Sequence, residues 1–290
     1  MNTHKRSTRF IPATPIREGA GVLVHRTIGT PAIRQLDPFI MLDHFSSDDP
    51  DEYIAGFPSH PHRGFNTFTY MIDGHMEHKD SMGNTGHLSP GSAQWMKAGS
   101  GVIHSEMPQQ ENGLMRGFQL WINLPAANKM ESPEYQEYSA DEFPMVETAG
   151  HQVKVLIGSY EMAQSPIKDS ITEASYFDVQ VKAGKEFRYP LSEDHQSFLY
   201  LFEGEGSFHG KPVKRHTLIA VGTEDSNIEF MAGKKGARFI LVSGKPIGEP
   251  IVQYGPFVMN TREEIEQALR DYQANDFVKT KAWVNRQKKT

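Results

Sequence analysis

Short segments rich in Val, Ile, Phe, Tyr and Thr, separated by glycine and proline, constrain the fold of this chain more than any other feature. The 290 residues include 25 glycines and 18 prolines, and such punctuation is typical of many short antiparallel strands. Residues 65–72 (FNTFTYMI) alternate in character and end at Asp73-Gly74, a strong hairpin turn signal. Residues 117–124 (GFQLWINL) predict an apolar strand that crosses the core. We therefore predict an all-β protein, built as a barrel or a sandwich.

The β pattern occurs twice, with a change of texture between the two series. Residues 125–145 are rich in Ala, Asn, Lys, Glu, Ser and Pro, and we expect a linker or an irregular excursion there. In the second series, YLFEGEG at residues 200–206 echoes YMIDG at residues 70–74. Such an internal echo favours two copies of one fold. We expect the first copy to span residues 1–135 and the second residues 136–290.

One helix is well marked, at about residues 261–273. Thr261 and Glu264 form a capping box, with Thr261 as N-cap and Glu264 at N3. Apolar residues then recur at i, i+3, i+4 and i+7, so the helix should pack on a β layer: Ile265, Ala268, Leu269 and Tyr272. A basic tail follows, which we expect to be solvated rather than a dedicated binding arm: Lys279, Lys281, Arg286, Lys288 and Lys289.

Charge and composition narrow the range of partners. The net charge of −6 gives no general reason to expect nucleic acid or an anionic membrane as a partner. No run approaches ~18 consecutive apolar residues, and no apolar run of signal-peptide length follows the basic N-terminal residues. Cysteine is absent, which excludes disulfides and thiolate ligands and suits a reducing compartment. We expect a cytoplasmic monomer in which histidine and carboxylate hold any metal.

Two short motifs place metal-binding side chains two residues apart, HPH at residues 60–62 and HSE at residues 104–106. On an extended strand, residues i and i+2 point to the same face, roughly 6.5 to 7 Å apart. Two such pairs on neighbouring strands can converge on one ion about 2 Å from each ligand atom. Three imidazoles and one carboxylate suit a divalent first-row metal and leave positions for small ligands. We favour a metal site over unconnected polar residues at a barrel mouth, with four ligands: His60, His62, His104 and Glu106.

The other histidines carry weaker signals. His44 is either next to the metal ligands or simply buried and hydrogen-bonded, and we favour the second. Three histidines lie around predicted turns, where we expect exposed side chains: His75, His78 and His87. The second half of the chain has no His-x-His or His-x-Glu pair, so we expect no metal there: His195, His209 and His216 are scattered.

Several further residues have two interpretations each. Arg63 and Gln94 either line the mouth of the metal site or form salt bridges and meet solvent. Large aromatic side chains are more often core than substrate platform, although an aromatic substrate needs such a wall: Phe57, Phe65, Trp95, Phe118 and Trp121.

With these strands and motifs in place, the sequence resembles the pirin family of the cupin superfamily. The resemblance implies a bicupin, two stacked jelly-roll barrels, with the metal in the N-terminal barrel (residues 1–135) and a metal-free C-terminal barrel (residues 136–290). The matching stretches span both halves of the chain: residues 35–45 (QLDPFIMLDHF), 57–69 (FPSHPHRGFNTFT), 78–86 (HKDSMGNTG), 90–108 (PGSAQWMKAGSGVIHSEMP) and 249–264 (EPIVQYGPFVMNTREE).

The resemblance also implies the metal ligands. In pirins the two histidines of HPH and the histidine and glutamate of H-[SA]-E hold the metal, and here these are His60, His62, His104 and Glu106. The family metal is typically iron, so we expect Fe(II), with Mn, Ni, Co, Cu and Zn as alternatives. One departure is Asn66, which stands where the family usually carries glutamate. We expect this change to affect the surroundings of the metal rather than its ligands.

Three functions remain open at this point. The first is a metal-dependent dioxygenase that cleaves a flavonol such as quercetin with dioxygen, as several bacterial pirins do, with Glu106 accepting the substrate's hydroxyl proton. The second is an iron-binding, redox-sensitive regulator that acts through a protein partner without catalysis. The third is a bicupin scaffold with a purely structural metal. We favour the first, and the choice of flavonol rests on the resemblance.

Overall fold

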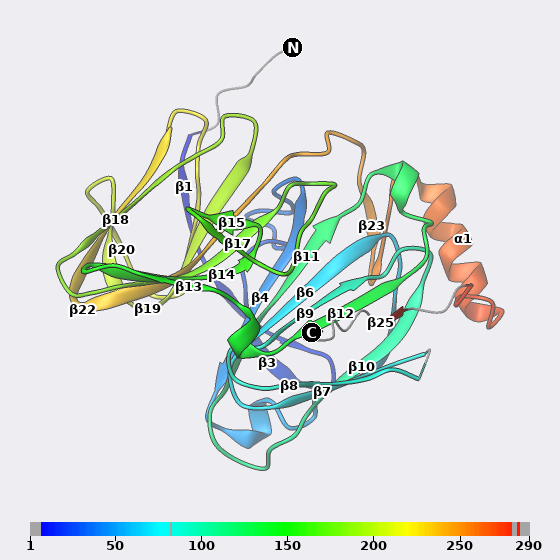
Figure 1. Ribbon diagram of the computed structural model, residues 1–290. Coiled ribbons are helices and arrows are strands. Elements are labelled where there is room, and N and C mark those ends of the chain that lie inside the picture. The colour runs from blue at the N-terminus through cyan, green and yellow to red at the C-terminus, as the bar shows by residue number, and fades with distance from the viewer. Residues whose placement is uncertain (1–6, 82, 280–282, 285–290) are drawn as a thin grey trace. The chain divides into compact units, whose positions relative to one another are not determined.

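The computed structural model describes residues 7–81, 83–279 and 283–284 (Figure 1). These residues form two compact units. The first unit contains residues 15–141 and the segment from residue 247 onward, and the second contains residues 142–246 together with the segment that ends at residue 14. The division therefore differs from the expected boundary after residue 135. Strand pairing explains the exchange at the N-terminus, because β1 (Arg9–Pro12) pairs with β21 (Thr217–Ala220) of the second unit.

The first unit contains two sheets whose inner faces contact each other. Glu106 of the smaller sheet reaches Thr69 of the larger one, with Thr69 Oγ1 and Glu106 Oε1 3.2 Å apart. The larger sheet has eight strands, in the order β2 (Thr14–Glu18), β3 (Val22–Arg26), β4 (Phe39–Ser47), β11 (Met115–Asn123), β6 (Phe65–Asp73), β9 (Ala93–Lys97), β12 (Glu134–Tyr138) and β25 (Trp283–Val284). The smaller sheet has four strands, in the order β5 (Phe57–His62), β10 (Val102–Pro108), β7 (Met76–Asp80) and β8 (Thr85–Leu88).

The segment expected to be a linker contains a sheet strand instead. β12 pairs antiparallel with β9 and buries Tyr135 and Tyr138. Its polar composition hid the strand, because Glu and Gln occupy three of its five positions and the two buried tyrosines are three residues apart rather than two. Short 3-10 turns lie on both sides of this strand and near β4: Pro50–Glu52, Ala126–Asn128 and Ala140–Glu142.

The predicted helix is confirmed as α1 (Arg262–Gln273), and Thr261 and Glu264 form the capping box. The helix packs on the hairpin of β23 (Val252–Tyr254) and β24 (Phe257–Met259) in the first unit (Figure 1). Ile265 and Ala268 are buried in that contact. Of the expected basic tail, Lys279 is described and exposed, and the rest lies outside the described residues: Lys281, Arg286, Lys288 and Lys289.

The second unit is one nine-stranded sheet around an apolar core. Its two longest strands, β19 (Gln196–Phe208) and β22 (Asn227–Gly244), pair along most of their length with two register shifts. The first half of each of these two long strands also pairs with one further strand, and the second half pairs with another. The remaining strands are β17 (Ser175–Val181), β14 (His151–Ile157), β13 (Met145–Glu147), β18 (Glu186–Pro190) and β20 (Lys211–Val213), and a separate two-stranded ladder joins β15 (Ser159–Tyr160) to β16 (Ala163–Gln164).

The prediction of an all-β bicupin is confirmed, with one correction to its geometry. The sheets of both units are open, with edge strands such as β13 and β2, so neither unit is a closed barrel. Within the part of the chain that the structure describes, no helix has the length and apolar character needed to cross a membrane.

Candidate metal centre

The HPH and HSE motifs lie on neighbouring strands of the smaller sheet. β5 and β10 are antiparallel, and His60 stands directly opposite His104 in their register. The register shifts between His104 and Glu106, as it does where an extra residue bulges a strand. Local strand geometry thus presents both motifs to the same face, as their spacing predicts.

Three of the four predicted ligands come together closely. The ligand-capable atoms of His60, His62 and His104 all lie within 4.8 Å of one another. Nε2 of His60 is 3.0 Å from Nε2 of His62. Two nitrogens bound at about 2.1 Å from one ion and at a right angle to each other are ~3.0 Å apart, so this spacing fits a shared metal.

Glu106 belongs to a second group that overlaps the first. Its carboxylate lies within 4.8 Å of ligand-capable atoms of His104 and His78. The Thr69 hydroxyl is 3.2 Å from Oε1 of Glu106 and 2.6 Å from Oε1 of Gln119. His104 therefore connects the three-imidazole group to the carboxylate that the HSE motif supplies.

Burial prepares two of the imidazoles for metal binding. His62 and His104 are almost completely buried, 2% and 1% exposed. Burial, and then the neighbouring histidines, hold the pKa of both rings well below 6.5, so both are neutral at neutral pH and offer a lone pair. Nε2 of His104 is buried and meets no hydrogen-bond partner within the described residues. A buried, unpaired imidazole nitrogen beside two further imidazoles and a carboxylate fits a divalent metal ion.

A large cavity of about 1150 Å³ opens onto these side chains within the first unit. His60, His62 and Glu106 line it, and Trp121 forms part of its wall, with its ring centroid 5.0 Å from that of His62. Further apolar lining comes from Val24, Ile40, Met41, Phe45 and Ile251. Cavities of this size and apolar character accommodate small organic ligands.

One wall of the cavity is charged but internally paired. Arg26 donates to both carboxylate oxygens of Asp43, at 2.7 and 2.6 Å, and its Nη1 lies 2.8 Å from Glu18. All three residues line the cavity. One guanidinium thus lies between two carboxylates on this wall, and neither carboxylate is without a cationic partner.

The expectation that His78 is exposed is wrong. His78 is fully buried, and its Nδ1 lies 3.3 Å from Nδ1 of His104. The residue sits on β7, whose pairing with β10 places His78 opposite Glu106. The turn signals around this segment hid a short inward-facing strand. His75 and His87 are exposed, as expected.

Gln94 and Arg63 have different roles, although the sequence left both of them open. Gln94 is buried, and its Nε2 lies 3.2 Å from Nδ1 of His78. Arg63 is buried too, but its guanidinium does not line the cavity, because it forms an ion pair with Asp271 at 2.7 Å. Asn66, at the position where the family usually has glutamate, is an odd number of residues from Thr69 on β6 and so faces the other side of the sheet.

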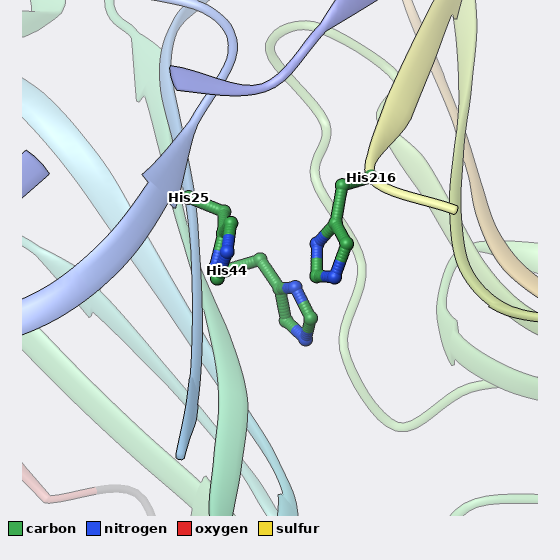
Figure 2. Close-up of side chains that lie close together, drawn as sticks. All are labelled: His25, His44 and His216. Carbon is green, nitrogen blue, oxygen red and sulfur yellow. The ribbon is translucent and has the colours of Figure 1, made fainter. Parts of the chain in front are cut away.

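A second pair of histidines in the first unit lies on β3 and β4. His25 stands opposite His44 in the antiparallel register, with ring centroids 5.9 Å apart (Figure 2). His44 is fully buried and stacks on Phe118 at 4.7 Å, which agrees with the buried alternative for this residue. Figure 2 also labels His216, which belongs to the second unit, where its Nδ1 is 3.1 Å from the Tyr200 hydroxyl.

Two β units, with a buried histidine and glutamate cluster between the sheets of one, define the two-domain cupin class. Residues 21–122 match the family model described as Pirin, and residues 176–278 match the model described as Pirin C-terminal cupin domain. The chain belongs to the pirin family.

Full-length relatives agree with this assignment. A Pseudomonas aeruginosa protein named "Putative quercetin 2,3-dioxygenase" is 48% identical over 264 residues, covering 89% of this chain and 93% of the relative. Human Pirin is 36% identical over 293 residues, covering 99% of both chains. The crystal structure of a quercetin 2,3-dioxygenase from Acinetobacter baumannii superimposes with a TM-score of 0.86 at 30% identity, covering 94% of this chain and 98% of that one.

Proposed function

We propose that this chain binds one divalent metal ion, Fe(II) by preference, and acts as a dioxygenase on a flavonol such as quercetin. The proposed ligands are His60, His62, His104 and Glu106. The observation that carries the proposal is the large cavity, with both apolar and polar lining, onto which two of these imidazoles and the carboxylate open. Family membership supports the metal, and the names of two relatives support the substrate class.

The cavity suits a flat aromatic substrate with polar hydroxyl groups. Trp121 and Met41 offer an apolar wall to its rings, while Gln119 offers a polar group near Glu106. Water has little access to His62 and His104, whose side chains are almost fully buried. The residues can therefore bind the substrate, hold its hydroxyl end towards the ligand cluster, and limit the water that reaches it.

Glu106 is the proposed proton acceptor. Its Oε1 lies 3.2 Å from the Thr69 hydroxyl, whose single proton has Gln119 Oε1 as a nearer acceptor at 2.6 Å, so the carboxylate keeps lone pairs for another proton donor. It lines the same cavity as His60 and His62, so a substrate hydroxyl that reaches the imidazoles also reaches this carboxylate. A bound Fe(II) would supply a Lewis acid that lowers the pKa of that hydroxyl and brings dioxygen and substrate together.

The test is aerobic incubation of the iron-loaded protein with quercetin, following loss of the flavonol absorption band and release of carbon monoxide. We expect metal-dependent turnover that is lost in His62→Ala, because one ligand is removed. In Glu106→Gln we expect turnover to fall by about 10²–10⁴-fold, the range of general-base catalysis.

His75→Ala is the matched control, because His75 lies near the same sheet but is exposed, and turnover should stay unchanged. Elemental analysis of each purified variant separates loss of metal from loss of chemistry. A wild-type protein that holds iron but leaves quercetin and related flavonols intact would refute the enzymatic proposal. That result would favour the regulatory function instead.

A further inference from the structure

His78 lies directly behind the proposed ligand His104 and has no role in the function proposed above. It is fully buried, and its ring centroid is 5.1 Å from that of His104 and 4.7 Å from that of Tyr135. The antiparallel pairing of β7 with β10 fixes this position, since it sets His78 opposite Glu106. Nδ1 of His78 meets neighbouring side chains, whereas its buried Nε2 has no hydrogen-bond partner within the described residues.

A chain of polar contacts runs from Tyr135 to His104. The Tyr135 hydroxyl lies 3.1 Å from Oε1 of Gln94 and 2.8 Å from Oε2 of Glu137. Nε2 of Gln94 lies 3.2 Å from Nδ1 of His78, and that nitrogen lies 3.3 Å from Nδ1 of His104. All these side chains belong to the first unit.

The donor and acceptor roles next to His104 follow from the amide of Gln94. Burial, and then the Glu137 carboxylate, raise the pKa of Tyr135, so its hydroxyl keeps its single proton, for which Glu137 at 2.8 Å is the nearer acceptor. Gln94 places its amide nitrogen, which can only donate, 3.2 Å from Nδ1 of His78. Nδ1 of His78 must accept, because a proton there would face the amide hydrogens.

The tautomer of His104 depends on the same nitrogen of His78. If Nδ1 of His78 accepts, Nδ1 of His104 must carry the proton and donate across the 3.3 Å separation. A neutral imidazole carries one N–H, so Nε2 of His104 has a free lone pair. That nitrogen is the buried one without a hydrogen-bond partner in the described residues. His78 then carries its own proton on Nε2, which has no hydrogen-bond partner within the described residues and lies 3.8 Å from the Asp80 carboxylate.

We propose that His78, oriented by Gln94 and Tyr135, is a positioning residue that holds His104 in the tautomer and ring orientation needed to bind the metal through Nε2. His78 itself is not a ligand, because its Nδ1 lone pair is taken by Gln94 and His104 and its Nε2 is protonated. This inference rests on the proposed metal centre. Groups that hydrogen-bond to a metal-binding histidine typically contribute 10–100-fold to metal affinity.

The test compares His78→Leu, which removes the acceptor, with His78→Asn, whose side-chain oxygen can replace Nδ1. Zn(II) affinity is measured by competition with a chromogenic chelator, and ¹⁵N NMR of histidine-labelled apo and Zn(II) protein reports the tautomer. We expect about 10–100-fold weaker binding and a mixed His104 tautomer in His78→Leu, with both largely restored in His78→Asn. His87→Leu, on the adjacent strand and exposed, is the matched control and should change neither.

Tyr135→Phe provides a second variant with almost unchanged volume, should His78→Leu not fold. It removes the hydroxyl that contacts Oε1 of Gln94, so we expect a second His104 tautomer to appear in the NMR spectrum. Unchanged affinity and tautomer in whichever of these two variants folds would overturn the inference, as would a Zn(II)-induced coordination shift on a His78 nitrogen. Failure of the wild-type protein to bind Zn(II) would instead overturn the metal centre itself.

Discussion

The buried ion pair between Arg63 and Asp271 offers the sharpest test of how the C-terminal helix supports the proposed metal centre. Arg63 directly follows His62 and is 1% exposed. Its Nε donates to the Ser100 carbonyl at 2.7 Å, Nη1 to Asp271 at 2.7 Å and Nη2 to the Phe277 carbonyl at 3.2 Å. The guanidinium carbon also lies 4.4 Å from the centroid of the Phe277 ring. Asp271→Ala therefore leaves the buried guanidinium with three weaker partners, which are two carbonyl oxygens and an aromatic ring.

We expect Asp271→Ala to destabilise the first unit by about 3 kcal/mol. Removing one partner of a buried ion pair costs about 3–5 kcal/mol, and the two carbonyls and the aromatic face that remain favour the lower end. For a unit of about 150–250 residues, each kcal/mol lowers Tm by roughly 2–4 °C, so the expected loss is about 6–12 °C.

The effect should depend on pH with a defined sign. Burial alone would raise the pKa of Asp271, but the hydrogen bonds from Arg63 and Gln267 outweigh it and lower that pKa. A carboxylate with a lowered pKa stabilises the fold above its unfolded-state value of about 3.9, and this stabilisation is lost as the pH falls through the lowered pKa. The difference between wild type and Asp271→Ala should thus shrink at acid pH.

Differential scanning calorimetry at pH 7 and at pH 3 checks both expectations. Glu266→Ala is the matched control on the same helix, because Glu266 is 52% exposed and its pair with Arg262 is a surface pair, worth at most about 1 kcal/mol. A loss of Tm in Asp271→Ala no larger than that in Glu266→Ala at pH 7 would contradict the expected cost of the unpaired guanidinium. A difference between wild type and Asp271→Ala that grows as the pH falls would contradict it equally.

Three further outcomes follow from single residues of the first unit. Burial lowers the pKa of Lys129 to about 8, so between pH 8 and 10.5 the unfolded chain binds more protons than the folded one. The free energy of unfolding of wild type, measured by urea titration, should therefore rise relative to that of Lys129→Met across this range. A difference that stays constant with pH would contradict this. Gly64 and Gly113 have nearly the same φ, +90° and +93°, but an added Cβ would lie 2.0 Å from a carbonyl oxygen at Gly64 and in open space at Gly113. Gly64→Ala should therefore lower Tm much more than Gly113→Ala. Ni(II) should quench the fluorescence of Trp121, whose ring is 5.0 Å from that of His62, and Trp121→Phe should lose most of the quenching; equal quenching in both proteins would place the ion elsewhere.

The parts of the site that could be predicted from the sequence depend on local geometry. His60 and His62, like His104 and Glu106, are two residues apart, and an extended strand sends both members of such a pair to one face. Their convergence on neighbouring strands follows from the β5–β10 pairing. The capping box that begins α1 is equally local, because its two side chains are three residues apart and each bonds to the other residue's backbone.

The parts that the sequence did not show depend on pairing between distant strands. His78 becomes part of the cluster because β7 pairs with β10, a partner some 26 residues away along the chain. Tyr135 reaches Gln94, 41 residues away along the chain, because β12 pairs with β9. Neither register has a local signature, so turn residues and polar composition suggested exposed loops at both places.

The exchange of chain segments between the two units also depends on contacts between residues far apart in the sequence. Two of these contacts support the candidate metal centre. Arg63 finds Asp271 208 residues further along the chain, and the amine of Lys129 bonds to the Val258 carbonyl 129 residues away. Arg63 directly follows the strand that carries His60 and His62, and the Lys129 amine also donates to the Gly64 carbonyl at 2.7 Å, so both contacts hold the segment from residue 247 onward close to the end of that strand. The local motifs therefore supply the donor atoms of the candidate centre, whereas contacts from the far end of the chain hold their backbone in place. A division of the chain after residue 135 would separate the ligands from the side chains that support them.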